Sequence, residues 1–549
     1  MQLSRVPLRL VRASGGTDME RRREFTRRDV LRFGALGAAG STLGLLRQAA
    51  RLPVRLSLDA LPPRLPDIQH DIAEFLAPVE TIDGVAFRFG PAFTKFVTAG
   101  LTRVPTRDDQ RVLADALDTI EGAYRFGPDG VFTFVSYGLP YFRLLPRGLA
   151  AAYVPRLLDQ PTRFAVEEAI PSPTDVTYRY DTVVKQRFNV AVRIEANALL
   201  FTIRSDSLQS AGDVEAWLAG SNLLAGRSVQ SPALRGLIRF NPARVMFTQR
   251  GMPRRVAERA GLVFANRIHP ESPMWMGFAD QQVAGSGSAA ITTFQGDASA
   301  RLTTARSGDY FDDGSVQHLS HVILDLEQFY LGGPSASRMP DERAHYGRAD
   351  GRFEFGAGNS GDAERRDTAP SDNSENDESF LERVQYMFRS TPPPSTGFAD
   401  QFSDGGGPTF LPNEFHGTDD AARGAQGIGT PEGKHRLGHL AALQRSSRAP
   451  DGNPIHIRMD GPGFDALDVP DGSNQPKLHF SIFVPTADFF AHMRTNQASV
   501  DLARAHAVAA DDQGIERFLT ATRRQNFLVP PRRHRAFPLL ELADENHFI

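Results

Sequence analysis

The chain has no cysteine among its 549 residues. This absence excludes disulfides, thiolate metal sites, iron–sulfur clusters and a cysteine nucleophile, so any metal must be held by histidine or carboxylate groups or arrive within a cofactor. The net charge is only -3 and the pI is about 6.6, so no global basic field favours nucleic acid as a partner. Hydrophobic residues make up 41% of the chain and charged residues 23%, which is an ordinary globular composition.

Long apolar runs are also absent from the sequence. The run from Phe33 to Leu46 is too short to span a bilayer as a helix, and it follows the paired arginines Arg27 and Arg28. A basic segment before a short apolar run is typical of an export signal, and the twin arginines resemble the Tat type. The alternative interpretation is a basic amphipathic helix. We interpret residues 1–52 as a Tat-type signal region.

This signal predicts a partner and a location. We expect the Tat translocation machinery to export the folded chain to a periplasmic, extracellular or cell-envelope position. No Ala-x-Ala cleavage site follows the apolar run. An uncleaved signal is therefore the one means of membrane attachment that the sequence suggests, and we expect no nucleic-acid partner.

Residues 53–290 carry alternating strand and helix patterns. Strand-like stretches occupy 84–97, 130–146, 187–206 and 236–251, and helical spacing of apolar residues occupies 106–122 and 213–220. The order β–α–β–β–α–β predicts a ferredoxin-like α+β unit.

A second unit of the same kind begins within residues 291–331 and continues in 439–549. Its strand-then-helix stretches are "SVQHLSHVILDLEQF" and "HFSIFVPTADFFAHM", and "IERFLTATRRQNFLVPP" suggests a helix and a closing strand. Each half is too small to bury its sheet face alone, so the two are expected to pack sheet to sheet, in the manner of a dimeric α/β-barrel. Between them, residues 332–438 are polar and acidic, and we expect a largely disordered insertion.

Two residues stand out as candidates for chemistry. Asp280 is the single carboxylate of "PMWMGFADQQVAG", and it is either a turn residue or a proton acceptor in a pocket. His456, in "PIHIRMDGP", is either an ordinary strand histidine or a metal ligand. The pairs His318/His321 and His435/His439 lack a third ligand in sequence, and the first pair would face opposite sides of a strand.

Five stretches, in order over residues 53–542, together resemble dye-decolourising peroxidases, which are haem proteins built from two ferredoxin-like halves. These stretches are "VFTFVSYGLPYF", "MGFADQQ", "DDGSVQHLSHVILDLEQF", "PIHIRMDGP" and "GIERFLTATRRQNFLVPP". The second resembles the family's Gly-x-x-Asp-Gly motif, and the fourth resembles the segment that supplies the haem ligand.

The resemblance implies haem b as cofactor, between two β-faces, with His456 as ligand to the iron. Asp280 would accept the proton of hydrogen peroxide, and Gly277 and Phe278 of the same motif would lie beside the cofactor. The implied function is an exported haem-dependent peroxidase-like oxidoreductase that acts on a small organic reductant. The alternative is a non-catalytic binding or scaffold protein that retains the fold without active haem.

The sequence departs from the family pattern at two places. Gln281 stands where the motif has its second glycine, and residues 463–476 contain no arginine where the family has its distal arginine. A fixed cation normally helps to stabilise the departing hydroxide. Arg239, Arg250 and His318 are the candidates to replace that arginine. The basic run over residues 523–535 is interpreted as a solvated or ion-paired surface.

Overall fold

The computed structural model describes the chain in segments. They are residues 42–50, 65–76, 80–82, 85–87, 90–146, 148–177, 185, 187–268, 272–276, 292–296, 299, 302–331, 456–498 and 514–543. The twin arginines, the expected insertion at 332–438 and the pair His435/His439 lie outside these residues.

The N-terminal half is a ferredoxin-like unit. Its elements in chain order are β3 (Phe93–Leu101), α2 (Arg107–Ala123), β4 (Phe132–Tyr137), β6 (Leu199–Ser205), α5 (Leu208–Leu218) and β10 (Arg244–Phe247). The antiparallel strands lie in the order β4-β6-β3-β10, and β9 (Ile238–Phe240) pairs with the end of β3. The predicted β–α–β–β–α–β order is confirmed.

The C-terminal half repeats this arrangement. Its elements are β11 (Ser315–Leu324), α8 (Leu326–Leu331), β13 (Gly461–Asp465), β14 (Gln475–Val484), α14 (Ala487–Ala498) and β15 (Leu519–Val529), with strand order β13-β14-β11-β15. Short β12 (Ile457–Arg458) adds to β14, and β5 (Arg193–Ile194) adds to β15. The helix expected before β15 is a single 3-10 turn, η6 (Gly514–Phe518), because the alternating residues from Leu519 onward belong to the strand.

The remaining elements are short and connect or cover these two units. They are η1 (Ala73–Phe75), β1 (Glu80–Ile82), β2 (Val85–Phe87), α3 (Leu139–Leu144), α4 (Leu149–Tyr153), β7 (Leu223–Leu224), β8 (Arg227–Ser228), α6 (Met252–Arg259), η2 (Ala265–Arg267), η7 (Arg532–His534) and η8 (Leu540–Leu542). Strands β1 and β2 form one hairpin, and β7 and β8 form another.

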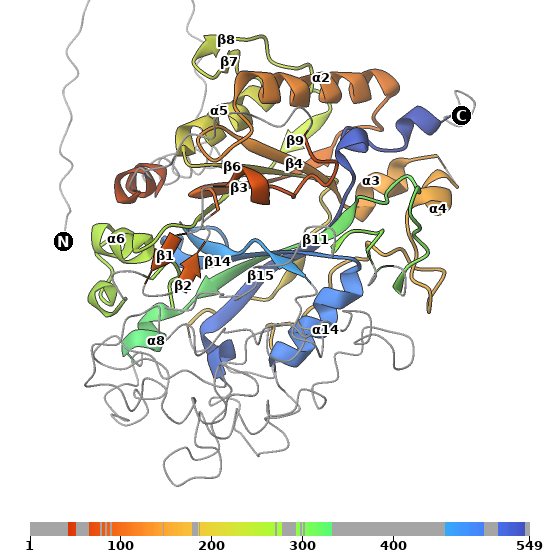
Figure 1. Cartoon of the computed structure of the whole chain (residues 1–549). Coiled ribbons are helices and arrows are strands. Elements are labelled where there is room, and N and C mark those ends of the chain that lie inside the picture. Colours follow the sequence, from red (N-terminus) through yellow and green to blue (C-terminus); the bar gives the residue numbers. More distant parts are fainter. Residues whose placement is uncertain are drawn as a thin grey trace, which may run out of the picture.

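The two halves join at both sheet edges to close a barrel. Strand β10 pairs with β13 through Met246 and Gly463, and β15 pairs with β4 through Leu528 and Tyr137. Since β10 also pairs with β3, eight strands form a continuous ring. Figure 1 shows the two sheets as facing layers, with α2 and α5 on the outer side of one and α14 on the outer side of the other. The α+β, dimeric α/β-barrel prediction is confirmed.

Helix α2 illustrates how the local sequence sets the outer layer. Thr106 caps its N-terminus in a capping box with Asp109, a pairing that satisfies two backbone N–H groups otherwise left without partners. Leu113, Leu117 and Ile120 recur at helical spacing and are buried against the sheet. The amphipathic pattern therefore fixes both the start of the helix and its packing face.

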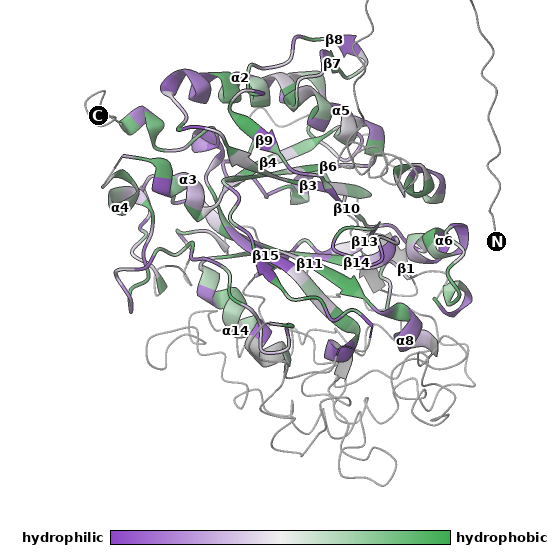
Figure 2. Cartoon of the chain, turned by 180° about the vertical axis from the view of Figure 1, so that it is seen from behind, coloured by the Kyte–Doolittle hydropathy of each residue, from purple (hydrophilic) through white to green (hydrophobic). Residues whose placement is uncertain are grey.

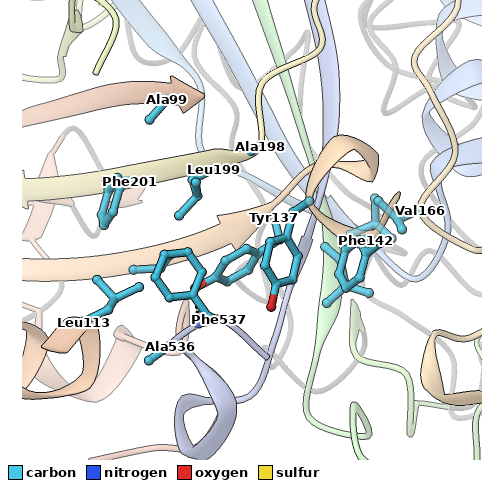
Figure 3. Packing of buried hydrophobic residues seen from close by; sticks show 14 of the residues in the cluster. Ala99, Leu113, Tyr137, Phe142, Val166, Ala198, Leu199, Phe201, Ala536 and Phe537 are labelled. Atoms are coloured by element: carbon cyan, nitrogen blue, oxygen red, sulfur yellow. Dashed lines mark hydrogen bonds between the residues drawn. The ribbon is translucent and has the colours of Figure 1, made fainter. Parts of the chain in front are cut away.

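An aromatic cluster covers the seam where β15 and β4 meet. Figure 3 shows Tyr137, Phe142 and Phe537 within this cluster of buried hydrophobic residues. The Tyr137 hydroxyl donates to the Arg535 carbonyl and accepts from the Phe537 N–H, both at 2.7 Å. The C-terminal segment is thereby tied to the first strand of the seam.

The barrel interior is filled by side chains rather than left open. Phe96, Phe132, Phe483 and Phe527 pack together inside it. Gln317 of β11 crosses from one sheet to the other: its Oε1 accepts from the Ser136 hydroxyl at 3.0 Å, and its Nε2 lies 3.4 Å from Thr202 Oγ1. The described side chains therefore occupy the space between the two sheets at this level of the barrel.

A helix at residues 42–49 packs onto this body. Its Leu46 and Ala49 are buried in the cluster that includes Met252 and Val256 of α6, and Arg255 donates to the Ala49 carbonyl at 2.7 Å. Part of the region interpreted as a signal thus belongs to the packed structure. Among the described residues, no helix has the length and apolar character needed to cross a membrane.

The outer face of the C-terminal sheet carries a buried ion pair. Arg524 of β15 is 2% exposed, and its guanidinium binds both carboxylate oxygens of Asp175, at 2.6 and 2.7 Å. Burial alone would raise the pKa of Asp175, but the charge and hydrogen bonds of Arg524 hold it below its usual range. Figure 2 shows that β15 carries hydrophilic stretches beside the more hydrophobic β11 and β14.

We expect Arg524→Met to lower the free energy of unfolding by about 3–5 kcal/mol at pH 7, because it leaves the Asp175 carboxylate buried without the guanidinium that pairs with it. The paired Asp175 has a depressed pKa, so in the native protein its contribution is present above the unfolded pKa and is lost as the pH falls. In the variant the unpaired carboxyl protonates more readily, and the loss should shrink between pH 7 and pH 5. Chemical denaturation at both pH values measures this.

The double variant Arg524→Met/Asp175→Asn serves as the control for this pair. It removes the stranded charge and should recover part of the lost stability at pH 7. A double variant no more stable than Arg524→Met, with no pH dependence in either, would show that the ion pair is not what Arg524 contributes.

Candidate functional site

Of the residues expected at the haem site, the structure describes His456. Asp280, Gly277 and Phe278 lie outside the described residues, so their positions remain predictions. His456 lies directly before β12, whose Ile457 and Arg458 pair with Phe483 and Ile482 of β14.

His456 is buried, with 1% of its surface exposed. An axial ligand must be kept from water by its surroundings, and an imidazole is a usual ligand to haem iron. The residue type, its burial and its place in the C-terminal half fit that role.

The proposed substitutes for the missing arginine have different surroundings. Arg239 is exposed on β9, and Arg250 is half-buried in a turn. His318 is fully buried on the outer face of β11, stacked on Phe490 with ring centroids 3.3 Å apart. Burial, and secondly the charge of Arg524, lower the pKa of His318 well below its usual range. The imidazole is therefore neutral near pH 7, and His318 does not supply a fixed positive charge.

The basic run over residues 523–535 was expected to be a solvated or ion-paired surface. Its arginines are ion-paired, but much of the run is buried. Arg523 pairs with Asp468 and Glu195, Arg524 with Asp175, and Arg535 with Asp118 and Glu121. Arg524 is the buried cation of the outer face, and the sequence interpretation of a surface run missed it. The strand alternation of β15 was the available signal, since it sends successive arginines to opposite faces.

A cluster of three metal-ligating side chains lies at one end of the barrel interior. His321 of β11, His479 of β14 and Asp465 at the end of β13 converge so that one nitrogen or oxygen of each lies within 4.8 Å of the others. His321 Nε2 is 3.6 Å from Asp465 Oδ1, and His479 Nε2 is 3.8 Å from Asp465 Oδ2. Both histidines are completely buried, whereas the Asp465 side chain is 26% exposed.

Strand pairing brings these residues together. His321 and His479 are direct partners in the β11–β14 ladder, and His479 pairs with Gly461 of β13. Their rings are 5.2 Å apart and stacked. Gly463 makes room for them, because a Cβ at that position would lie 2.3 Å from His479 Nε2.

Charged groups surround the cluster. His321 Nδ1 is 2.9 Å from Thr522 Oγ1, and the Thr522 hydroxyl donates to Asp468 at 3.0 Å. Lys477 Nζ is 3.7 Å from Asp465 Oδ1 and donates to the Leu467 carbonyl at 2.7 Å. Burial would raise the pKa of Asp465, but the neighbouring His321, Lys477 and His479 hold it well below its usual range. Asp465 is therefore an ionised carboxylate close to two imidazoles and the Lys477 side chain.

Sequence reasoning did not find this cluster. It correctly expected His318 and His321 on opposite faces of a strand, but it did not connect His321 with His479 or Asp465. Such a connection requires the register of two neighbouring ladders, which no local pattern gives. Two histidines and a carboxylate can bind a transition metal or exchange protons, and the carboxylate is open to solvent.

Several solved structures are distantly similar to the chain, and they are of the kind that the motifs resemble. A putative DyP-type peroxidase from Shewanella oneidensis has 11% identity and a TM-score of 0.38, and the match covers 83% of this chain and 96% of that chain. The encapsulated DyP-type peroxidase from Mycobacterium smegmatis has 12% identity and a TM-score of 0.37, with 84% and 98% covered. A DypB variant from Rhodococcus jostii in complex with haem has 11% identity and a TM-score of 0.37, with 81% and 95% covered.

These values describe a divergent relationship, and the chemistry of those proteins does not transfer to the chain by likeness alone. No curated protein sequence matches the chain. One family model does match, over residues 91–344 and 416–531, and its description is a family of unknown function, DUF7405. The matched residues make up more than half of the chain and include all of β11, β13, β14 and β15. The chain therefore belongs to the DUF7405 family.

Proposed function

We propose that the chain is an exported haem-dependent peroxidase-like oxidoreductase, with haem b as cofactor, that uses hydrogen peroxide to oxidise a small organic reductant. The observation that carries this proposal is His456, a histidine with 1% exposure in the C-terminal half of a double ferredoxin-like barrel. The five ordered motifs of the sequence support it.

The proposal gives this chain's residues distinct tasks. His456 would bind the iron from one side, and Gly277 and Phe278 would contact the cofactor. When bound, haem would supply the redox-active iron that reacts with peroxide. Asp280 would accept a proton from hydrogen peroxide, which requires an ionised carboxylate within hydrogen-bonding reach of the substrate oxygen.

A non-catalytic binding or scaffold function is the second candidate. Gln317 and the aromatic side chains fill the barrel interior, and no arginine occurs in residues 463–476. A protein that uses only its surface, to bind partners, would need neither an open interior nor a catalytic arginine. Peroxide-dependent turnover of a dye well above that of free haemin would reject this candidate.

Protein produced with haem supplied should show a Soret band, and His456→Ala should lose it, because the substitution removes the axial imidazole. Absorption spectra of the two purified proteins measure this. His534→Ala removes a partly exposed histidine of η7 and serves as the matched control, which should keep the band. Absence of haem in the wild-type protein would end the proposal.

Asp280→Asn should lower peroxide-dependent dye turnover by about a hundredfold or more while haem binding is unchanged, since a positioned general base contributes about 10²–10⁴-fold. Steady-state kinetics on haem-loaded protein test this. Asp471→Asn, a change at a carboxylate on the exposed part of the chain, is the control. Equal turnover in wild type and Asp280→Asn would remove Asp280 from the mechanism and leave the haem proposal standing.

Export is proposed to depend on the twin arginines. The double change Arg27→Lys/Arg28→Lys keeps both positive charges but should retain the chain in the cytoplasm, because the Tat pathway reads the arginine pair as an address. Cell fractionation with immunodetection gives the distribution, and Arg21→Lys/Arg22→Lys controls for other changes in the basic segment. Unchanged export of the first variant would contradict the Tat assignment.

A further inference from the structure

We propose that His321, Asp465 and His479 bind one first-row divalent transition-metal ion at the end of the barrel. This site is separate from His456, goes beyond the proposed haem function and does not rest on it.

The ligand atoms are close to the spacing that a metal requires. Bonds of about 2.0–2.1 Å to imidazole nitrogen and about 2.0–2.2 Å to carboxylate oxygen place tetrahedral ligand atoms about 3.4 Å apart. His321 Nε2 is 3.6 Å from Oδ1 of Asp465 and His479 Nε2 is 3.8 Å from Oδ2 of the same carboxylate, and one ligand atom of each residue lies within 4.8 Å of the others. The two nitrogen–oxygen distances are too long for hydrogen bonds, yet within a few tenths of an ångström of that spacing.

The hydrogen bonds behind His321 orient its free nitrogen. Thr522 Oγ1 lies 2.9 Å from His321 Nδ1, and the Thr522 hydroxyl has two acceptors within reach, Asp468 at 3.0 Å and the His321 carbonyl at 3.3 Å. The other ring nitrogen, Nε2, faces Asp465 and lies 3.6 Å from its Oδ1. A hydrogen-bonding group behind the ring is the usual arrangement at metal-binding histidines.

His479 gives an independent indication. It is completely buried, and neither ring nitrogen has a hydrogen-bond partner within the part of the chain that the structure describes. His321 Nε2 is also buried and has no hydrogen-bond partner among the described residues. A buried polar atom without a partner costs about 1–3 kcal/mol. A metal bond to His479 Nε2, the atom that Gly463 accommodates, satisfies that nitrogen.

The donor set selects the class of metal. Two imidazoles and one carboxylate suit Fe²⁺, Mn²⁺, Co²⁺ or Zn²⁺, whereas Ca²⁺ and Mg²⁺ prefer oxygen ligands. The 26% exposure of the Asp465 side chain provides a path from solvent. Three protein ligands also leave at least one coordination position for water or a small substrate.

Lys477 is the competing charge at this site. Its ammonium lies 3.7 Å from Asp465 Oδ1 and offers the carboxylate a cation that an incoming metal must displace or repel. Two like charges at such a distance repel appreciably even at a partly exposed position. Replacing Lys477 by an uncharged side chain of similar length should therefore strengthen metal binding, which a purely structural role of the cluster would not predict.

The test is a titration of the chelator-treated full-length protein with Co²⁺, followed by its visible absorption and by Zn²⁺ competition, with Mg²⁺ as a comparison. We expect one bound ion per chain and at least about hundredfold weaker binding by Asp465→Asn, which keeps the side-chain shape. Asp471→Asn should bind as the wild type does. Lys477→Met should bind at least tenfold more tightly.

Three results would overturn the site: no uptake of Co²⁺ or Zn²⁺ by the wild type at millimolar concentration, equal uptake by Asp465→Asn, or weaker uptake by folded Lys477→Met. Circular dichroism establishes that each variant is folded. The haem proposal is tested separately, because His456→Ala should retain Co²⁺ binding and Asp465→Asn should retain any Soret band. Loss of one property without the other identifies which proposal has failed.

Discussion

The pairing of β10 with β13 and of β15 with β4 is the constraint on which the rest of the molecule depends. Each ferredoxin-like half ends at edge strands whose backbone N–H and C=O groups lack partners, and the other half supplies them. The pairings close a ring in which strands of both sheets turn alternate residues inward. An eight-stranded barrel is just wide enough for side chains to fill, and the interior phenylalanines and Gln317 do so.

A filled interior restricts where chemistry can occur. Polar residues inside must satisfy one another, and Gln317 does so with Ser136, Thr202 and Ser481. Toward one end the polar groups become charged: Arg523 pairs with Asp468 and Glu195, and Arg244 also pairs with Glu195. His479 differs from these groups, because neither of its ring nitrogens has a hydrogen-bond partner among the described residues. A site within the barrel is therefore possible where the ring opens to solvent at Asp465, rather than at its centre.

The sequence indicated the two halves because their strand and helix patterns are local. Thr106 and the apolar spacing after it mark α2, and the alternation in "SVQHLSHVIL" marks β11. Patterns of charge were less informative. Arg523 and Arg524 suggested a solvated or ion-paired surface. Both are ion-paired, but the strand sends one inward to Asp468 and the other outward to the buried Asp175. The candidate site depends on ladder register between β11, β13 and β14, and register is a property of the assembled sheet.

The two proposed sites both depend on β14. His456 precedes the pair formed by Ile457 and Phe483, whereas His479 pairs with His321 and Gly461. Four residues separate Phe483 from His479, which is roughly 13 Å along an extended strand. Substitutions at that separation usually act independently unless they share partners. One strand can thus serve two sites, through Phe483 for the residue that follows His456 and through His479 for the metal ligands.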